Sequence, residues 1–249
     1  MLKSPHIKVQ SKKDDDPFLD LRVSKNIMNY LWDIIENNKI SDVDGNNILA
    51  GNISKSVYLQ ENGNFFYDNV LKDCAEYMYY RDWNNYYNEH IAKITPLAEF
   101  RLDDLWVNYQ RQTEFNPCHQ HGGMFSFALF MKIPTKWQEQ HTLPIAANSN
   151  TPAASDFQFL LGRGSEVQPI PFPLSPDDEG RMLFFPAWLG HQVYPFYGTE
   201  EIRITVSGNL KHEERTEHQS IEWMEMRGEQ MEKELRAWNE KTKQRKLNE

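Results

Sequence analysis

From about residue 100 onward, the chain consists of short runs of β-branched and aromatic residues separated by Pro, Gly, Asn and Asp. The runs are LWVNYQ, MFSFALFMKI, DFQFLLG, RMLFFPAW, HQVYPFY and IRITVSGNL. Several short strands with turn signals between them are typical of an antiparallel sandwich or barrel. We therefore expect residues 100–211 to form a β-rich core, and we expect the small, polar stretch from Gln138 to Ser155 to be a loop that covers a site.

The first 99 residues have a different pattern, which predicts helices packed against the outside of one sheet. Residues 1–16 are polar and are expected to be loose. Ser24 is suited to cap a helix over KNIMNYLWDIIENNK, and a second helix is expected from Phe66 to Asn88. The apolar positions at helical spacing are Ile27, Leu31, Ile34 and Ile35 in the first helix and Val70, Cys74 and Tyr77 in the second.

Residues 212–249 form a third region, in which apolar residues recur at steps of three and four in a highly charged segment. The stripe consists of Ile221, Met224, Met231, Leu235 and Trp238. Such a stripe predicts an amphipathic helix, which either docks on its own domain or pairs with a second copy in a homodimer.

Charge and cysteine content exclude several classes of function. The net charge of −9 disfavours a nucleic-acid surface, because phosphate binding needs clustered Lys and Arg. The two cysteines, Cys74 and Cys118, are too few for a disulfide framework or a thiolate zinc site. The polar first residues are unlike a signal peptide, and no apolar run approaches the roughly 18 residues of a membrane span. We expect a soluble cytoplasmic protein without membrane contact.

Two histidines stand two residues apart in NPCHQHGG, just before one of the predicted strands. On a strand, His119 and His121 would point to the same face, close enough to share one metal ion. A third histidine, His191, follows a turn 70 residues later and begins another short strand. The remaining five are interpreted as surface or core residues: His6, His90, His141, His212 and His218.

The strand IRITVSGNL also carries polar residues at alternate positions. Its alternation places Arg203, Thr205, Ser207 and Asn209 on one face and Ile202, Ile204, Val206 and Leu210 on the other. A polar row that faces inward is costly unless it binds something polar. An ordinary amphipathic strand, with Arg203 pointing outward, fits the same alternation, so both interpretations stay open at this point.

Taken together, the residues resemble the iron(II)- and 2-oxoglutarate-dependent oxygenases. The likeness rests on HQH before a hydrophobic strand, then FPAWLGHQV, then RIT in the strand that ends SGN, and it extends from Leu105 to Leu210. The chain is most similar to small prolyl-hydroxylase-like members from phages and bacteria. The resemblance implies an α+β fold built on a double-stranded β-helix, a cupin-like jelly roll, flanked by N-terminal helices. For a phage-encoded chain, the expected compartment is the host cytoplasm.

The resemblance also implies a role for individual residues. His119 and His191 match two histidine ligands of Fe(II), and Arg203 matches the basic residue that holds the distal carboxylate of 2-oxoglutarate, with Thr205 adding a hydroxyl. These roles agree with the chemistry of the side chains, since imidazole binds Fe(II) and a guanidinium holds a carboxylate by two parallel bonds. Tyr109 is a weaker candidate for contact with the co-substrate.

The chain departs from the family pattern at His121, where a carboxylate is commonest. Three interpretations remain open: His121 is the third ligand, a distant Asp or Glu replaces it, or the position is unligated. We favour the first, because Fe(II) sites with three histidines occur in other oxygenases.

The resulting hypothesis is a dioxygenase that hydroxylates a C–H bond of a peptidyl side chain such as proline, or of a small metabolite, with succinate and CO2 as co-products. Two alternatives are carried with it. One is a cupin-like three-histidine metal enzyme that does not use 2-oxoglutarate. The other is a non-catalytic jelly-roll protein of structure or assembly, of viral origin.

Overall fold

The fold consists of two antiparallel sheets and a small number of helices. The structure, a computed structural model, describes residues 2–11, 16–37, 51–61, 63–86, 99–163 and 165–213. The C-terminal stripe and the end of the second predicted helix, residues 87–88, lie outside these ranges. Among the described residues, no helix is long and apolar enough to cross a membrane.

Helices and short strands are interspersed along the chain. The helices are α1 (Lys25–Asn37), α2 (Lys72–Tyr86), α3 (Trp137–His141), a π-helical segment at Tyr67–Leu71 and a 3-10 turn at Pro176–Asp178. The strands are β1 (Ile7–Ser11), β2 (Leu19–Val23), β3 (Lys55–Tyr58), β4 (Glu99–Gln110), β5 (Asn116–His119), β6 (Phe125–Lys132), β7 (Phe157–Arg163), β8 (Glu166–Phe172), β9 (Arg181–Pro186), β10 (His191–Val193) and β11 (Arg203–Glu213).

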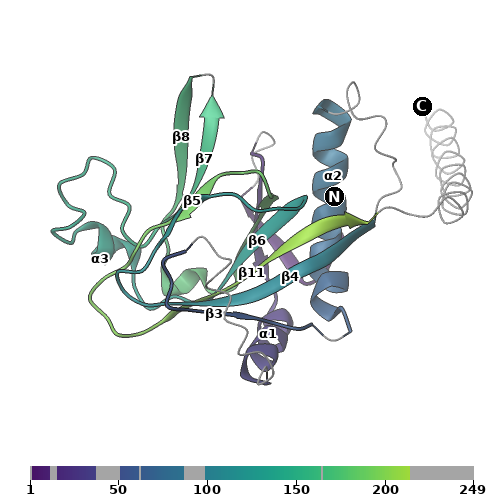
Figure 1. Ribbon diagram of the computed structural model, residues 1–249, viewed down its shortest axis with the longest axis horizontal. Coiled ribbons are helices and arrows are strands. Elements are labelled where there is room, and N and C mark those ends of the chain that lie inside the picture. The colour runs from purple at the N-terminus through teal and green to yellow at the C-terminus, as the bar shows by residue number, and fades with distance from the viewer. Residues whose placement is uncertain are drawn as a thin grey trace, which may run out of the picture.

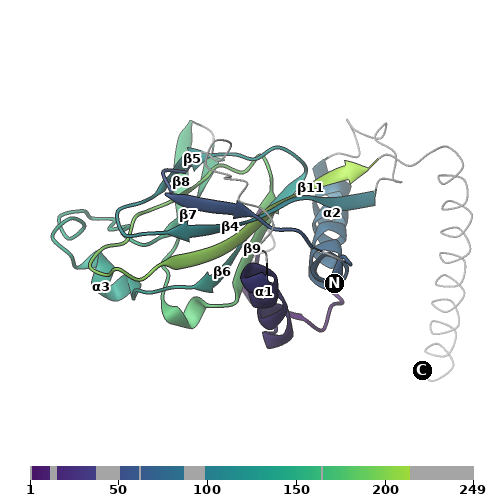
Figure 2. The ribbon, with the colours of Figure 1, turned by 60° about the horizontal axis from the view of Figure 1, so that its bottom comes forward.

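A seven-stranded sheet in the order β1-β2-β9-β6-β11-β4-β3 faces a four-stranded sheet in the order β5-β10-β7-β8. This arrangement is consistent with the expected double-stranded β-helix. The β7–β8 hairpin projects from the body, and α3 lies at the end of the molecule remote from α2 (Figures 1 and 2).

All six runs that predicted strands contain one, although HQVYPFY is a strand only over its first three residues. The expectation that residues 1–16 are loose is wrong for Ile7–Ser11, which forms β1 and pairs with β2. The N-terminal region therefore contributes β1, β2 and β3 to the large sheet in addition to its helices. These strands were missed because each has only four or five residues, too few for a clear alternation.

The large sheet has a core on each of its faces. On one face, Ile27 and Leu31 of α1 and Val70 and Cys74 of the second helical region pack against the sheet, as the helical spacing predicts. On the other face, a mainly aromatic core fills the space between the two sheets; its members include Phe130, Phe157, Phe159, Phe172 and Phe185. Because β6 is buried on both faces, its sequence is a continuous apolar run rather than an alternating one.

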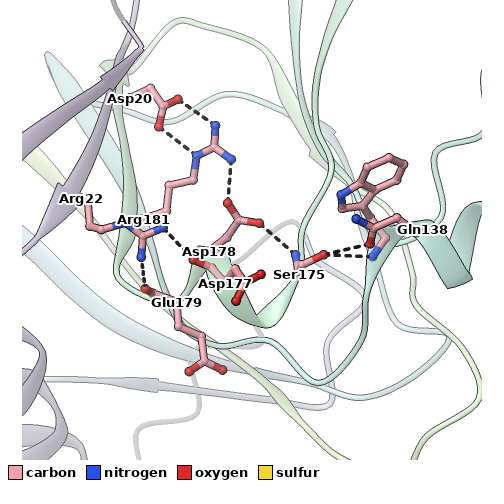
Figure 3. Close-up of polar contacts among 9 residues, drawn as sticks. Asp20, Arg22, Gln138, Ser175, Asp177, Asp178, Glu179 and Arg181 are labelled. Carbon is pink, nitrogen blue, oxygen red and sulfur yellow. Dashed lines mark hydrogen bonds and ion pairs between the residues drawn. The ribbon is translucent and has the colours of Figure 1, made fainter.

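A buried ion pair joins the N-terminal strands to the β core. Arg181 on β9 donates from Nε and Nη2 to the two carboxylate oxygens of Asp20 on β2, at 2.9 and 2.7 Å, and from Nη1 to Asp178 at 3.0 Å (Figure 3). Asp20 is 2% exposed. A bidentate pair of this kind has the geometry that best offsets the desolvation of two charges.

We expect Arg181→Met to lower the free energy of unfolding by about 3 kcal/mol or more, because it leaves the Asp20 carboxylate buried without its cation. Urea unfolding would measure the change. The matched control is Lys132→Met, which removes an exposed ion pair with Glu201 and should cost less than about 1 kcal/mol. Equal losses of unfolding free energy in Arg181→Met and Lys132→Met would contradict a stabilising role for the buried Arg181–Asp20 pair.

Candidate active site

Three histidines converge between the two sheets, and strand pairing accounts for their positions. In the register of β10 with β5, His191 lies directly opposite His119, and β7 flanks His191 on its other side. His121 lies two residues beyond the end of β5, where its backbone N–H donates to the carbonyl of Ala187 at 2.9 Å. One ligand nitrogen from each ring lies within 4.8 Å of the others.

Backbone carbonyls orient two of the three rings. The Nδ1 atom of His119 lies 2.7 Å from the carbonyl oxygen of Pro117, and the Nδ1 atom of His191 lies 3.0 Å from that of Leu189. Since a carbonyl only accepts, Nδ1 carries the proton in both rings and Nε2 keeps its lone pair. This second hydrogen bond is the usual partner of a metal-binding histidine.

The three rings are neutral at neutral pH. Burial lowers the pKa of His121 to about 4 and that of His191 to about 3, and in both cases the neighbouring His119 lowers it further. Burial also lowers the pKa of His119, against the opposing effect of its bond to Pro117. Neutral imidazoles are the form that binds metal, so protons do not compete for these nitrogens near pH 7.

The cluster fits a metal ion. The Nε2 atoms of His121 and His191 are 3.2 Å apart, and two nitrogens that bind one ion at right angles with bonds of about 2.1 Å would lie about 3 Å apart. Three imidazoles suit Fe(II), as well as other divalent metals of the first transition row. Among the described residues, no carboxylate joins the group, so His121 stands where the commonest family pattern has an acid.

A cavity of about 130 Å³ lies against the three histidines. Besides the histidines, Asn116 and Gln120, its polar side chains come from the inner faces of β3, β4 and β11: Ser56, Asn108, Gln110, Thr205 and Ser207. The inward-facing interpretation of the polar row on β11 is therefore the correct one for Arg203, Thr205 and Ser207. The described residues that line the cavity include no Asp, Glu, Lys or Arg.

Arg203 is 1% exposed and lies beside this cavity. Its Nη2 donates to the carbonyl of Ser155 at 3.0 Å and to the Ser155 hydroxyl, and its Nη1 lies 3.5 Å from Oε1 of Gln110, which lines the cavity. Burial lowers the pKa of Arg203 to about 10, with Asp156 opposing the shift, so the guanidinium is charged at neutral pH.

Ser155 and Asp156 were missed by the sequence analysis, which assigned residues 138–155 to a loop. Ser155 is fully buried in a left-handed conformation, with φ of 75°. Asp156 is 1% exposed and accepts from Nε2 of His141 at 2.8 Å. His141 is thus a partly buried partner of Asp156 and lies outside the histidine cluster. The sequence does not indicate this role for Ser155, because serine is not a residue type that predicts a left-handed conformation.

Tyr109 lies on the other face of β4, where it packs against the core beneath the helices and Lys55 lies over its ring at 4.8 Å. Its position does not support contact with a co-substrate in this cavity. Asn108 and Gln110, one residue to either side, face the cavity instead. The pairing of Gln110 with Arg203 would have identified the correct face, but that register is not readable from the sequence.

We expect His119→Ala to weaken the binding of Fe(II), or of Mn(II) as a redox-stable substitute, by about 100-fold or more, because it removes one of three ligands. Isothermal titration under anaerobic conditions would measure the affinity. His6→Ala, which alters a histidine bonded to Ser24 outside the cluster, should leave it unchanged. Retention of wild-type affinity by His119→Ala would exclude the three-histidine site.

A family model matches part of the chain. Residues 104–209 match the model of a family described as "Putative 2OG-Fe(II) oxygenase". No curated protein matches the chain. Among solved structures, the chain is 10% identical to a Pseudomonas putida prolyl-4-hydroxylase, with 78% of this chain and 92% of that chain covered and a TM-score of 0.46.

Two further structures match at similar levels. The viral collagen prolyl hydroxylase of Paramecium Bursaria Chlorella virus-1 is 10% identical, with 79% and 97% covered and a TM-score of 0.44. The carbocyclase SnoK from nogalamycin biosynthesis is 8% identical, with 78% and 79% covered and a TM-score of 0.49. The family match includes all three histidines together with Arg203. Over these 106 of its 249 residues, the chain resembles the 2OG-Fe(II) oxygenase family.

Proposed function

We propose that this enzyme is an Fe(II)- and 2-oxoglutarate-dependent dioxygenase that hydroxylates a C–H bond, with His119, His121 and His191 as the metal ligands. The observation that carries the proposal is the convergence of three neutral imidazoles beside a buried guanidinium, with a polar cavity between the sheets. A bound iron would supply oxidation by dioxygen, coupled to the conversion of 2-oxoglutarate to succinate and CO2.

Charge balance supports an anionic co-substrate. A divalent ion held by three neutral rings keeps its full charge, and no carboxylate among the described lining residues offsets it. Burying such a charge is costly unless an anion accompanies it. The two carboxylates of 2-oxoglutarate meet this need, since one would offset the metal and the other would pair with Arg203.

The residues of the chain would orient the reactants. The Arg203 guanidinium would hold the distal carboxylate by two parallel hydrogen bonds, and the Thr205 hydroxyl would donate a third. Asn108 and Gln110 would hydrogen-bond from the opposite strand. The aromatic residues Phe130, Phe157 and Phe185 would exclude water from the remaining wall.

The direct test is anaerobic addition of Fe(II) and 2-oxoglutarate, which should produce a visible charge-transfer absorption band, followed by measurement of succinate after oxygen is admitted. Metal binding without the band or succinate would favour a cupin-like enzyme that does not use 2-oxoglutarate.

We expect Arg203→Lys to raise the KM for 2-oxoglutarate about tenfold, because an ammonium makes point contacts where a guanidinium makes a bidentate pair. Arg203→Met should raise it further, while the metal affinity of both variants stays near that of the wild type. Succinate formation at varied 2-oxoglutarate gives the values, and Arg111→Met, at an exposed position, is the control. An unchanged KM in both Arg203 variants would remove this residue from the proposed site.

We also expect metal and 2-oxoglutarate to strengthen each other's binding by on the order of 10- to 100-fold in the wild type, because the co-substrate supplies the missing negative charge. His121→Asp adds a carboxylate, so it should bind Mn(II) more tightly in the absence of 2-oxoglutarate and show a smaller mutual effect. Calorimetric titrations in both orders would measure the coupling. His121→Asn, which adds no charge, is the matched control. Equal coupling in the wild type and His121→Asp would contradict the charge argument.

A further inference from the structure

A second, larger cavity of about 660 Å³ lies beside the histidine cavity. Its walls come from β5, β10 and the loop that follows α3, which is visible at one end of the molecule in Figure 1. Residues from all three segments line it, among them Phe115, Cys118, Ile145, Ala153, Tyr194 and Tyr197.

In the part of the chain that the structure describes, no Asp, Glu, Lys, Arg or His lines this cavity, although a quarter of the residues in the chain are charged. It also exposes large apolar side chains to solvent: Phe115 is 40% exposed, Ile145 66% and Tyr194 36%. Large hydrophobic residues that are exposed at a concave surface are typical of a binding site. A charged ligand would find no compensating charge here, so the lining selects for an uncharged one.

The second cavity adjoins the histidine cavity. Asn116 and Val193, which pair with each other across β5 and β10, line both cavities. A molecule bound in the second cavity would therefore lie next to the three histidines.

We propose that this cavity is the substrate-binding site, and that the substrate is an uncharged small molecule with an apolar ring. The ring would pack against Phe115 and Tyr194, which directs a C–H bond toward the histidines. The cavity volume lies within the range of roughly 300–1,000 Å³ typical of small-molecule sites. This inference rests on the proposed function, because it assigns the reacting centre to the three histidines.

Three probes that share one ring and differ in charge test the selectivity: indole, indole-3-acetate and tryptamine. Saturation-transfer NMR on the full chain with Zn(II) and 2-oxoglutarate would give the affinities. Indole should bind saturably and at least fivefold more tightly than either charged probe. The neutral peptide acetyl-Gly-Trp-Gly-amide carries the same ring and should bind more weakly than indole. Tighter binding of a charged probe or of the peptide would overturn the proposal.

Two pairs of variants locate the binding site. Ala153→Trp fills the cavity and should weaken indole binding about tenfold or more, while Ala147→Trp, exposed on the same loop outside the lining, should not. Tyr194→Ala removes a ring of the lining and should weaken indole binding severalfold. The control, Trp188→Ala, removes a ring that is 59% exposed and lies outside both linings, so it should leave indole binding unchanged. Unchanged indole binding in both Ala153→Trp and Tyr194→Ala would overturn the assignment of this cavity as the substrate site. If one of the two variants fails to fold, unchanged binding in the other would overturn it.

Separate readouts distinguish the two proposals. Ala153→Trp should retain the charge-transfer band with Fe(II) and 2-oxoglutarate, because it lies outside the histidine cavity. A wild-type enzyme that forms the band but does not bind indole would refute the substrate site alone. An enzyme that binds indole in the predicted cavity but never forms the band would refute the proposed function and leave the cavity as a ligand site.

Discussion

The antiparallel pairing of β5 with β10 is the constraint on which the candidate site depends. It sets His119 opposite His191, although 71 positions separate them in the chain, and it builds one wall of each cavity. A shift of one residue in this register would turn one imidazole to the other face of the sheet. The flanking strand β7 pairs with β10, and the aromatic core packs beneath both strands. The contacts that stabilise the small sheet therefore also fix the relative positions of His119 and His191.

The second constraint is electrostatic. At the candidate site, the described residues bury the Arg203 guanidinium next to a place suited to a metal cation. Asp156 is the nearest described carboxylate that acts on Arg203, and burial raises its own pKa while the bond to His141 opposes that rise. The site is therefore suited to receive negative charge from outside the chain, which gives a physical reason for metal and co-substrate to strengthen each other's binding.

The sequence predicted those parts of the site that depend on residue type and local spacing. It identified the three histidines and the polar row on β11, because imidazoles and an arginine in an apolar strand are chemically conspicuous. It named Tyr109 as a weak candidate and did not single out Asn108, because the face of β4 that lines the cavity depends on pairing with a distant strand. Ser155 could not be identified from the sequence for a similar reason: its partner Arg203 lies 48 residues away.

The strands at the N-terminal end of the chain have a consequence for self-association. In the large sheet, β2 occupies the hydrogen-bonding edge of β9, and β1 in turn covers β2. A chain shortened to begin at Ser24 would present the backbone of β9, a strand with an almost entirely apolar sequence, as an open edge. Open apolar edges recruit further strands. β1 and β2 thus protect the edge of β9 from pairing with a strand of a second molecule.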